Sequence, residues 1–96
     1  MKEKKRFFSL SNIGVRFAAV IGGRGDSWEV SNRVERLDLW KNKWSELPSL
    51  QIARECHASC TLDHSAIYVF CGIDNKNQYL NSIEKLPISR QMQDPW

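Results

Sequence analysis

The sequence has no apolar segment long enough to cross a membrane as a helix. In the part that follows the basic residues 2–6, the longest apolar run is residues 17–21, whereas a membrane-spanning helix needs about 20 apolar residues. Polar residues interrupt this part at positions 9, 11, 12 and 16, so it lacks the continuous apolar core of a signal peptide. These absences predict a soluble, cytoplasmic protein without a membrane partner.

Cysteine is scarce and does not form a disulfide framework. Cys56, Cys60 and Cys71 make an odd number, and on one extended strand Cys56 and Cys60 would lie about 13 Å apart, beyond disulfide reach. Reduced thiols are typical of a reducing compartment.

An extended basic surface is also absent. The net charge is +3, but residues 2–6 alone carry four positive charges and one negative, so residues 7–96 are neutral. Nucleic-acid-binding domains usually spread basic residues along one face. We therefore expect a solvated basic terminus and no nucleic-acid partner.

Groups that carry catalysis are missing from the pattern. There is no nucleophile beside a base, no carboxylate pair, and no lysine and helix after the glycine-rich residues 22–25. Cys56, His57, Cys60 and His64 lie within nine residues, but strand alternation directs Cys56 and Cys60 to one face and His57 to the other. We expect no metal, no cofactor and no enzymatic activity.

What the sequence does contain is an internal repeat. Identical or similar residues recur at a separation of 49 residues: Val20 and Val69, Gly23 and Gly72, Asn32 and Asn81, Val34 and Ile83, Glu35 and Glu84, Leu37 and Leu86, and Leu39 and Ile88. A repeat of this length is typical of architectures in which each copy is one supersecondary unit.

Each copy is predicted to form short strands, because β-branched and aromatic residues are bounded by Gly, Asp, Asn, Ser and Pro. We expect strands at residues 7–13, 17–22, 33–39 and 43–47 of the first copy, and at residues 57–62, 66–70 and 82–86 of the second. No segment combines helix caps with a sustained helical period. The fold class is therefore predicted to be all-β.

The motifs of the first copy occur in an order that resembles the kelch repeat. Residues 20–23 end in a glycine doublet, residues 32–38 contain Glu35, and Trp44 follows Leu37 by seven residues. The second copy matches through residues 67–72 and 80–86. The resemblance implies a fragment of a kelch-type β-propeller with about two four-stranded antiparallel blades, the second of which is incomplete.

On this basis the chain divides into a basic N-terminal tail (1–6), a first kelch repeat (7–50) and a second kelch repeat (51–96) with an incomplete fourth strand. The second copy departs from the pattern at several positions. Cys71 stands where the doublet has its first glycine, and Trp96 follows Glu84 by 12 residues whereas Trp44 follows Glu35 by 9. Leu37 and Leu86 also occupy the position of a tyrosine in the family.

The residues of the repeat motif are expected to be structural. Glycine allows a strand to end abruptly, and the ring of the tryptophan is expected to pack between adjacent blades. These residues are Gly22, Gly23, Glu35, Trp44, Gly72 and Glu84.

Resemblance to kelch proteins that bind peptides also implies where a partner would bind. The loops that begin at Arg24 and Ile73, and the connection that contains Arg54 and Glu55, would line one mouth of the propeller. Arg24 and Arg54 would hold an acidic peptide, because a guanidinium donates two parallel hydrogen bonds to a carboxylate. Arg54 is equally suited to tie blades together.

The resemblance thus implies a scaffold that presents loops to a protein partner, as substrate adaptors and cytoskeletal proteins of this family do. Two alternatives remain open: a fragment of a kelch-containing enzyme whose active site lies on absent blades, and a truncated product without independent activity. About three repeats are generally needed for stability, and this chain has two. Because its blade edges are also unpaired, the isolated chain is predicted to be unstable or to self-associate.

Overall fold

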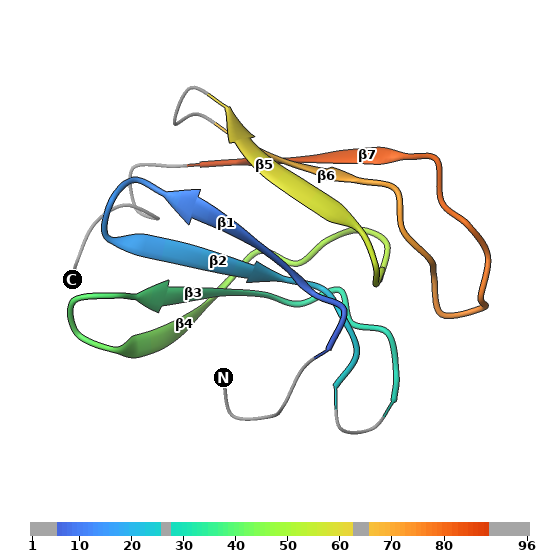
Figure 1. The fold of residues 1–96 in the computed structure, drawn as a ribbon, viewed down its shortest axis with the longest axis horizontal. Helices are drawn as coiled ribbons and strands as arrows, with labels where there is room; N and C mark the ends of the chain where they lie inside the picture. The colour runs from blue at the N-terminus through green and yellow to red at the C-terminus, as the bar shows by residue number, and fades with distance from the viewer. Residues whose placement is uncertain (1–5, 26–27, 63–65, 89–96) are drawn as a thin grey trace.

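The computed structural model describes residues 6–25, 28–62 and 66–88, and all regular secondary structure in these residues is β-strand. A sheet of four strands contains β1 (Ser9–Ile13), β2 (Phe17–Ile21), β3 (Val34–Asp38) and β4 (Lys43–Leu47). A sheet of three strands contains β5 (Ala58–Leu62), β6 (Ala66–Phe70) and β7 (Ile83–Pro87). The predicted strands are confirmed, with ends displaced by no more than two residues. Figure 1 shows the two sheets, which we call blade 1 and blade 2.

Both blades are antiparallel meanders, so each strand pairs with the strand that follows it in the chain. Phe17 of β2 faces Ile13 of β1 and Asp38 of β3, and Ile67 of β6 faces Thr61 of β5 and Leu86 of β7. Short turns join β1 to β2, where Gly14 has a φ of 63°, and β3 to β4, whereas longer loops at residues 22–33 and 71–82 join β2 to β3 and β6 to β7. The expected all-β class and the architecture of two partial propeller blades are confirmed.

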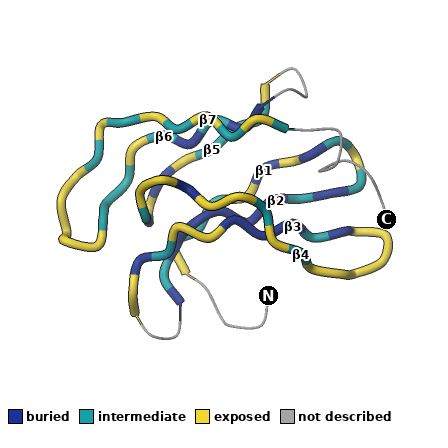
Figure 2. The backbone as a smooth tube through the Cα atoms, turned by 180° about the vertical axis from the view of Figure 1, so that it is seen from behind, coloured by how far each residue is buried: buried dark blue, intermediate teal, exposed yellow. Residues whose placement is uncertain are grey.

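The core lies between the two blades. Alternate residues of β2 point toward blade 2, and the same face of blade 1 includes Ile13 and Val34. Figure 2 shows buried segments where the two sheets face each other. The main cluster consists of Ile13, Phe17, Ala19, Ile21, Val34, Leu50, Ile67 and Val69. Burial of these apolar groups is therefore what joins the two blades.

Two hydrogen bonds reinforce the junction beside the apolar cluster. The hydroxyls of Ser11 in β1 and Ser59 in β5 lie 2.6 Å apart, and the hydroxyl of Thr61 donates to the carbonyl of Asn12 at 2.6 Å. These contacts place β1 directly against β5.

The repeat seen in the sequence is also a repeat of the backbone. Arg6 and Arg24 exchange backbone hydrogen bonds of 2.9 and 2.8 Å, and 49 residues later Glu55 and Ile73 exchange bonds of 3.0 and 2.9 Å. Gly23 accepts from Ser31 at 2.7 Å, and Gly72 accepts from Leu80 at 2.8 Å. Arg6, assigned to the predicted tail, thus forms the first bridge of blade 1, while residues 1–5 lie outside the described residues.

Candidate protein-interaction site at the loop end of the blades

The loops that follow β2 and β6 leave the same end of the two sheets (Figure 1). Isolated bridges join Arg6 to Arg24 and Arg24 to Val30 in blade 1, and Glu55 to Ile73 in blade 2. The backbone N–H of Val30 donates to the side-chain oxygen of Asn75 at 3.3 Å, which links one loop to the other. We call this end of the molecule the loop face, defined by residues 6–8, 24–25, 28–31, 55–56 and 73–80.

Arg24 and Glu55, both predicted to contact a partner, are bound to each other. Arg24 Nε donates to Glu55 Oε2 at 2.7 Å, and a terminal guanidinium nitrogen donates to Oε1 at 3.0 Å. The hydrogen bond to Glu55 raises the pKa of Arg24 above its usual range, against a smaller opposing effect of burial. Arg24 also donates to the carbonyl of Trp28. Its guanidinium thus holds the Glu55 carboxylate, and its contact with an acidic peptide stays a prediction.

Arg54 is completely buried, and its guanidinium is out of reach of a partner in this structure. It donates to the carbonyls of Cys71 and Ser82 at 3.1 and 3.0 Å and to Glu84 at 2.7 Å. Glu84 in turn accepts from the backbone N–H groups of Gln51 and Ile52 at 2.7 and 3.1 Å. Arg54 and Glu84 therefore fasten the connection between the blades to β7, which is the tying role weighed for Arg54.

Ile73 takes part in the loop face through its backbone. It is half-buried, and it forms bridges with Glu55 on one side and Tyr79 on the other. The backbone of Ile73 thus joins the connection between the blades to the loop segment that carries Tyr79.

Three aromatic side chains project from the loop face. Phe7 is 54% exposed, Trp28 is 56% exposed and Tyr79 is 88% exposed. The guanidinium of Arg6 lies 4.2 Å from the centre of the Trp28 ring, a cation–π contact. Sequence reasoning missed these residues. Trp28 and Tyr79 lie outside the predicted strands, which was a usable signal because loops often carry binding residues, whereas Phe7 was placed in the predicted strand at residues 7–13.

The residues of the repeat motif lie where the backbone needs them. Gly22 and Gly23 have φ values of 61° and 92°, and Gly72 has 98°. A Cβ at Gly22 would lie 2.6 Å from the carbonyl oxygen of Arg54, so only glycine permits this approach of the connection. Glu35 is buried.

Trp44 does not lie in the junction between the two described blades. Strand alternation pairs it with Leu37 on the face of blade 1 that points away from blade 2, and Trp44 is 37% exposed. Its expected packing between adjacent blades therefore stays a prediction for that uncovered face.

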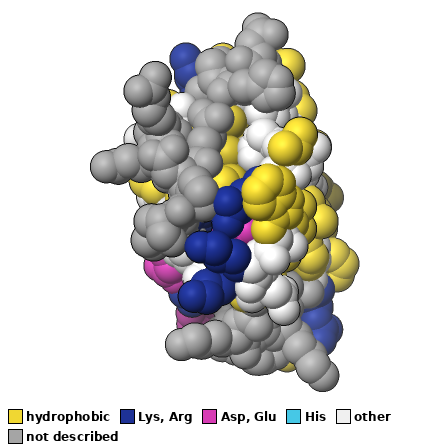
Figure 3. Space-filling view, turned by 90° about the vertical axis from the view of Figure 1, so that its left-hand side faces the viewer, with side chains coloured by type: hydrophobic (Ala, Val, Ile, Leu, Met, Phe, Trp, Pro, Cys, Tyr) yellow, Lys and Arg dark blue, Asp and Glu magenta, His cyan; other side chains and the backbone are white. Residues whose placement is uncertain are grey.

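The opposite end of the molecule is formed by the β1–β2 and β3–β4 turns, where basic side chains lie beside hydrophobic ones (Figure 3). Arg16 donates to both carboxylate oxygens of Asp38 at 2.9 and 2.8 Å, and its guanidinium lies 4.6 Å from the centre of the Trp40 ring. Arg16, with help from the backbone N–H groups of Lys41 and Trp40, lowers the pKa of Asp38 to about 2. Asp38 thereby fixes the β3–β4 turn.

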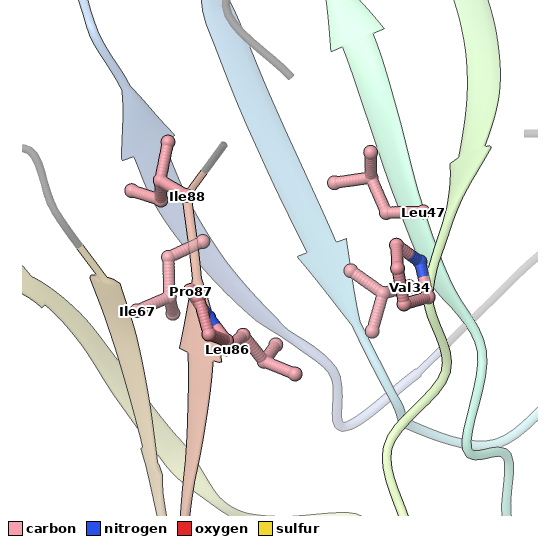
Figure 4. Close-up of a pocket in the computed structure, with 7 residues that line it drawn as sticks. Val34, Leu47, Ile67, Leu86, Pro87 and Ile88 are labelled. Atoms are coloured by element: carbon pink, nitrogen blue, oxygen red, sulfur yellow. The ribbon is translucent and has the colours of Figure 1, made fainter. Parts of the chain in front are cut away.

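An apolar cleft of about 250 Å³ lies between the blades, and Figure 4 shows its lining side chains facing one another. Its lining consists of Val34, Leu47, Pro48, Ile67, Leu86, Pro87 and Ile88. Small-molecule sites usually add a few polar groups that orient the ligand, and this lining has none. The cleft is therefore a gap in the packing between blades.

The described residues also include potential metal ligands and three cysteines. Within them, no three His, Cys, Asp or Glu side chains are grouped as metal ligands, while His64 lies outside them. Cys56, Cys60 and Cys71 are free thiols. No helix in the described part of the chain has the length and apolarity needed to cross a membrane.

The comparisons with known proteins agree with the geometry. The kelch motif matches residues 20–51, which contain the doublet, the Arg24 loop, β3 and β4. The human protein named Kelch-like protein 34 is 33% identical over 72 residues, which cover 75% of this chain and 11% of that protein. The chain thus spans about a tenth of the length of this relative. The two sheets repeat at a separation of 49 residues, and Gly23 and Gly72 accept equivalent backbone hydrogen bonds after β2 and β6. The chain carries kelch repeats and belongs to the kelch repeat family.

Proposed function

We propose that the chain is a protein-interaction module whose loop face binds a protein partner through Phe7, Trp28 and Tyr79. The observation that carries this proposal is the exposure of three aromatic rings on loops whose backbones are held by bridges. Aromatic residues supply much of the binding energy in protein interfaces, and a fixed loop loses little entropy on binding.

The pairing of the basic side chains limits the chemistry of this partner. Arg24 is neutralised by Glu55, and Arg54 is buried with Glu84, so we do not propose recognition of an acidic peptide by these two arginines. We propose instead a partner that inserts apolar side chains between the exposed rings. The role of a substrate adaptor or cytoskeletal binder fits this chemistry, and free thiols support a cytoplasmic setting.

The test compares two exposed aromatic sites at opposite ends of the molecule. The chain and its Trp28→Ala/Tyr79→Ala and Trp40→Ala variants are immobilised, and the cytosolic proteins they retain are identified by mass spectrometry. The affinity of each retained protein is then measured by calorimetry with purified components. We expect a partner whose affinity falls at least tenfold, about 1.4 kcal/mol, in the double variant and is unchanged in Trp40→Ala.

Trp40 is the matched control, because it is 71% exposed but lies on the β3–β4 turn. If every retained protein binds the double variant and the wild type equally, the loop face is not the binding surface and the proposal is wrong.

A further inference from the structure

Equivalent positions of the two repeats are buried in blade 1 and exposed in blade 2. Val34 is 2% exposed, whereas Ile83, 49 residues later, is 57% exposed. Ile13 is 1% exposed, whereas Leu62 is 50% exposed. The outer face of blade 2 therefore repeats the face of blade 1 that blade 2 covers, with Lys85 in the place of Arg36. Its members are Ala58, Cys60, Leu62, Ala66, Tyr68, Phe70, Ile83 and Lys85.

The outer face of blade 1 carries the complementary residue pattern, and on it Val20 is already 2% exposed. Its members are Leu10, Ala18, Val20, Leu37 and Trp44. Ala18, Val20 and Leu37 occupy the positions that Ile67, Val69 and Leu86 hold in blade 2. Those three residues form the surface with which blade 2 packs against blade 1. Leu10 on this outer face is 60% exposed.

We propose that a second copy of this chain stacks its blade 1 on the outer face of blade 2, head to tail. The occupant follows from the junction already present within the chain, because each outer face repeats one half of that junction. Such a contact joins different surfaces of the two copies, so it continues into further copies until a ring closes. It uses blade faces, whereas pairing of open edges would extend a sheet sideways.

At the position of Gly22 and Cys71, the junction between copies is expected to be less closely packed than the junction within the chain. Gly22 has the carbonyl oxygen of Arg54 2.6 Å and a ring carbon of His57 2.8 Å from the site of a Cβ. Its equivalent in blade 2 is Cys71, which has a side chain and a φ of 57°. Cys71 therefore holds the next copy slightly away at the loop end, and Cys71→Gly is expected to tighten self-association at least threefold.

The experiment blocks each outer face separately by adding a charge. Leu10→Glu blocks blade 1, Ile83→Glu blocks blade 2, and sedimentation velocity over a range of concentrations gives the mass in solution. We expect the wild type to associate and each variant to remain a monomer. An equimolar mixture of the two variants is expected to form a 1:1 dimer, because one intact junction remains between them.

Val15→Glu is the matched control, since Val15 is 91% exposed in the β1–β2 turn and belongs to neither face. It is expected to associate as the wild type does. Circular dichroism verifies that each variant is folded, and Leu10→Ser and Ile83→Ser replace any glutamate variant that is not.

The proposal is overturned if the folded wild type stays a monomer, if either single variant associates like the wild type, or if the mixture forms no dimer. Loss of association in Val15→Glu also overturns it. These outcomes are independent of the loop face, because none of the substitutions lies on it, so failure here leaves the proposed partner binding untouched.

Discussion

Blade 1 presents one face to blade 2 and buries it, while blade 2 carries the same residue pattern on a face that the described residues leave open. Equivalent residues form the backbone bridges at the loop end of both repeats. The difference in exposure between the two faces therefore does not come from a different fold of the strands. It comes from the presence of a neighbour on one side. In a stacked repeat protein the stability of one unit depends on the next unit, and the following predictions test how far this holds here.

The largest expected effect is the loss of the buried tie in blade 2. Arg54→Ala should lower the free energy of unfolding by about 3–5 kcal/mol, because it leaves Glu84 with an uncompensated charge. The side chains of Arg54 and Glu84 are 0% and 13% exposed. Urea denaturation followed by circular dichroism measures the change.

A surface ion pair in blade 1 provides the control for this substitution. Arg33, directly before β3, pairs with Glu46 of β4, and their side chains are 50% and 60% exposed. Arg33→Ala should cost less than about 1 kcal/mol. Equal losses in the two variants would show that Arg54 is not a structural tie.

The second prediction compares equivalent aliphatic positions in the two repeats. Ile13→Ala should lower the free energy of unfolding by about 2–5 kcal/mol, because it leaves a cavity between the blades. Leu62→Ala removes a side chain of equal size from the uncovered position and should cost less than about 1 kcal/mol. Urea denaturation is performed at concentrations where the chain is a monomer, and similar costs would mean that blade 2 does not protect blade 1.

Much of this fold could be predicted from the sequence because the strands are encoded locally. The apolar residues of β2, the glycines that follow it and the repeat at 49 residues each specify backbone geometry over a few neighbours. The all-β class and the seven strands therefore followed without knowledge of any long-range contact.

The site was less predictable because charge pairing depends on contacts between distant segments. Arg24 and Glu55 are separated by 31 residues and Arg54 and Glu84 by 30, and neither spacing indicates a contact in a linear pattern. The orientation of Trp44 likewise required knowing which face of blade 1 is covered. The exposed rings of Trp28 and Tyr79 became apparent only when the core was known.

The third prediction separates backbone strain from close packing at the end of β2. Gly22 and Gly14 have nearly equal φ values of 61° and 63°, but only Gly22 has atoms close to the site of a Cβ. Gly14→Ala should cost about 1–2 kcal/mol of unfolding free energy from strain alone. Gly22→Ala should cost about 2–4 kcal/mol, because overpacking against Arg54 and His57 is added.

Thermal denaturation of both glycine variants measures this difference. An equal decrease in melting temperature would mean that the connection between blades moves away from an added Cβ, so that blade 1 needs no close approach of blade 2 at this point.

The smallest expected effect is the pH dependence of stability that comes from His57. His57 is buried, and neither ring nitrogen has a hydrogen-bond partner among the described residues. Burial lowers the pKa of His57 below its usual 6.5, the charge of Arg54 lowers it further, and the nearby backbone of Ile21 opposes the shift. Protonation therefore favours the unfolded chain, so this contribution to stability is fully present above about pH 6.5 and declines as the pH falls below it.

Phe8 in the first repeat is equivalent to His57 in the second. The substitution His57→Phe therefore removes the titratable ring and keeps an aromatic side chain that the first repeat has at this position. His57→Phe should keep the free energy of unfolding nearly constant between pH 7.5 and 5.5, whereas the wild type should lose stability with a slope of at most about 1.4 kcal/mol per pH unit. Asp38 does not contribute to this slope, because its pKa of about 2 and its usual 3.8 both lie below the window. Parallel urea titrations at the two pH values measure the slope, and an identical pH dependence in both proteins would show that folding does not lower the pKa of His57.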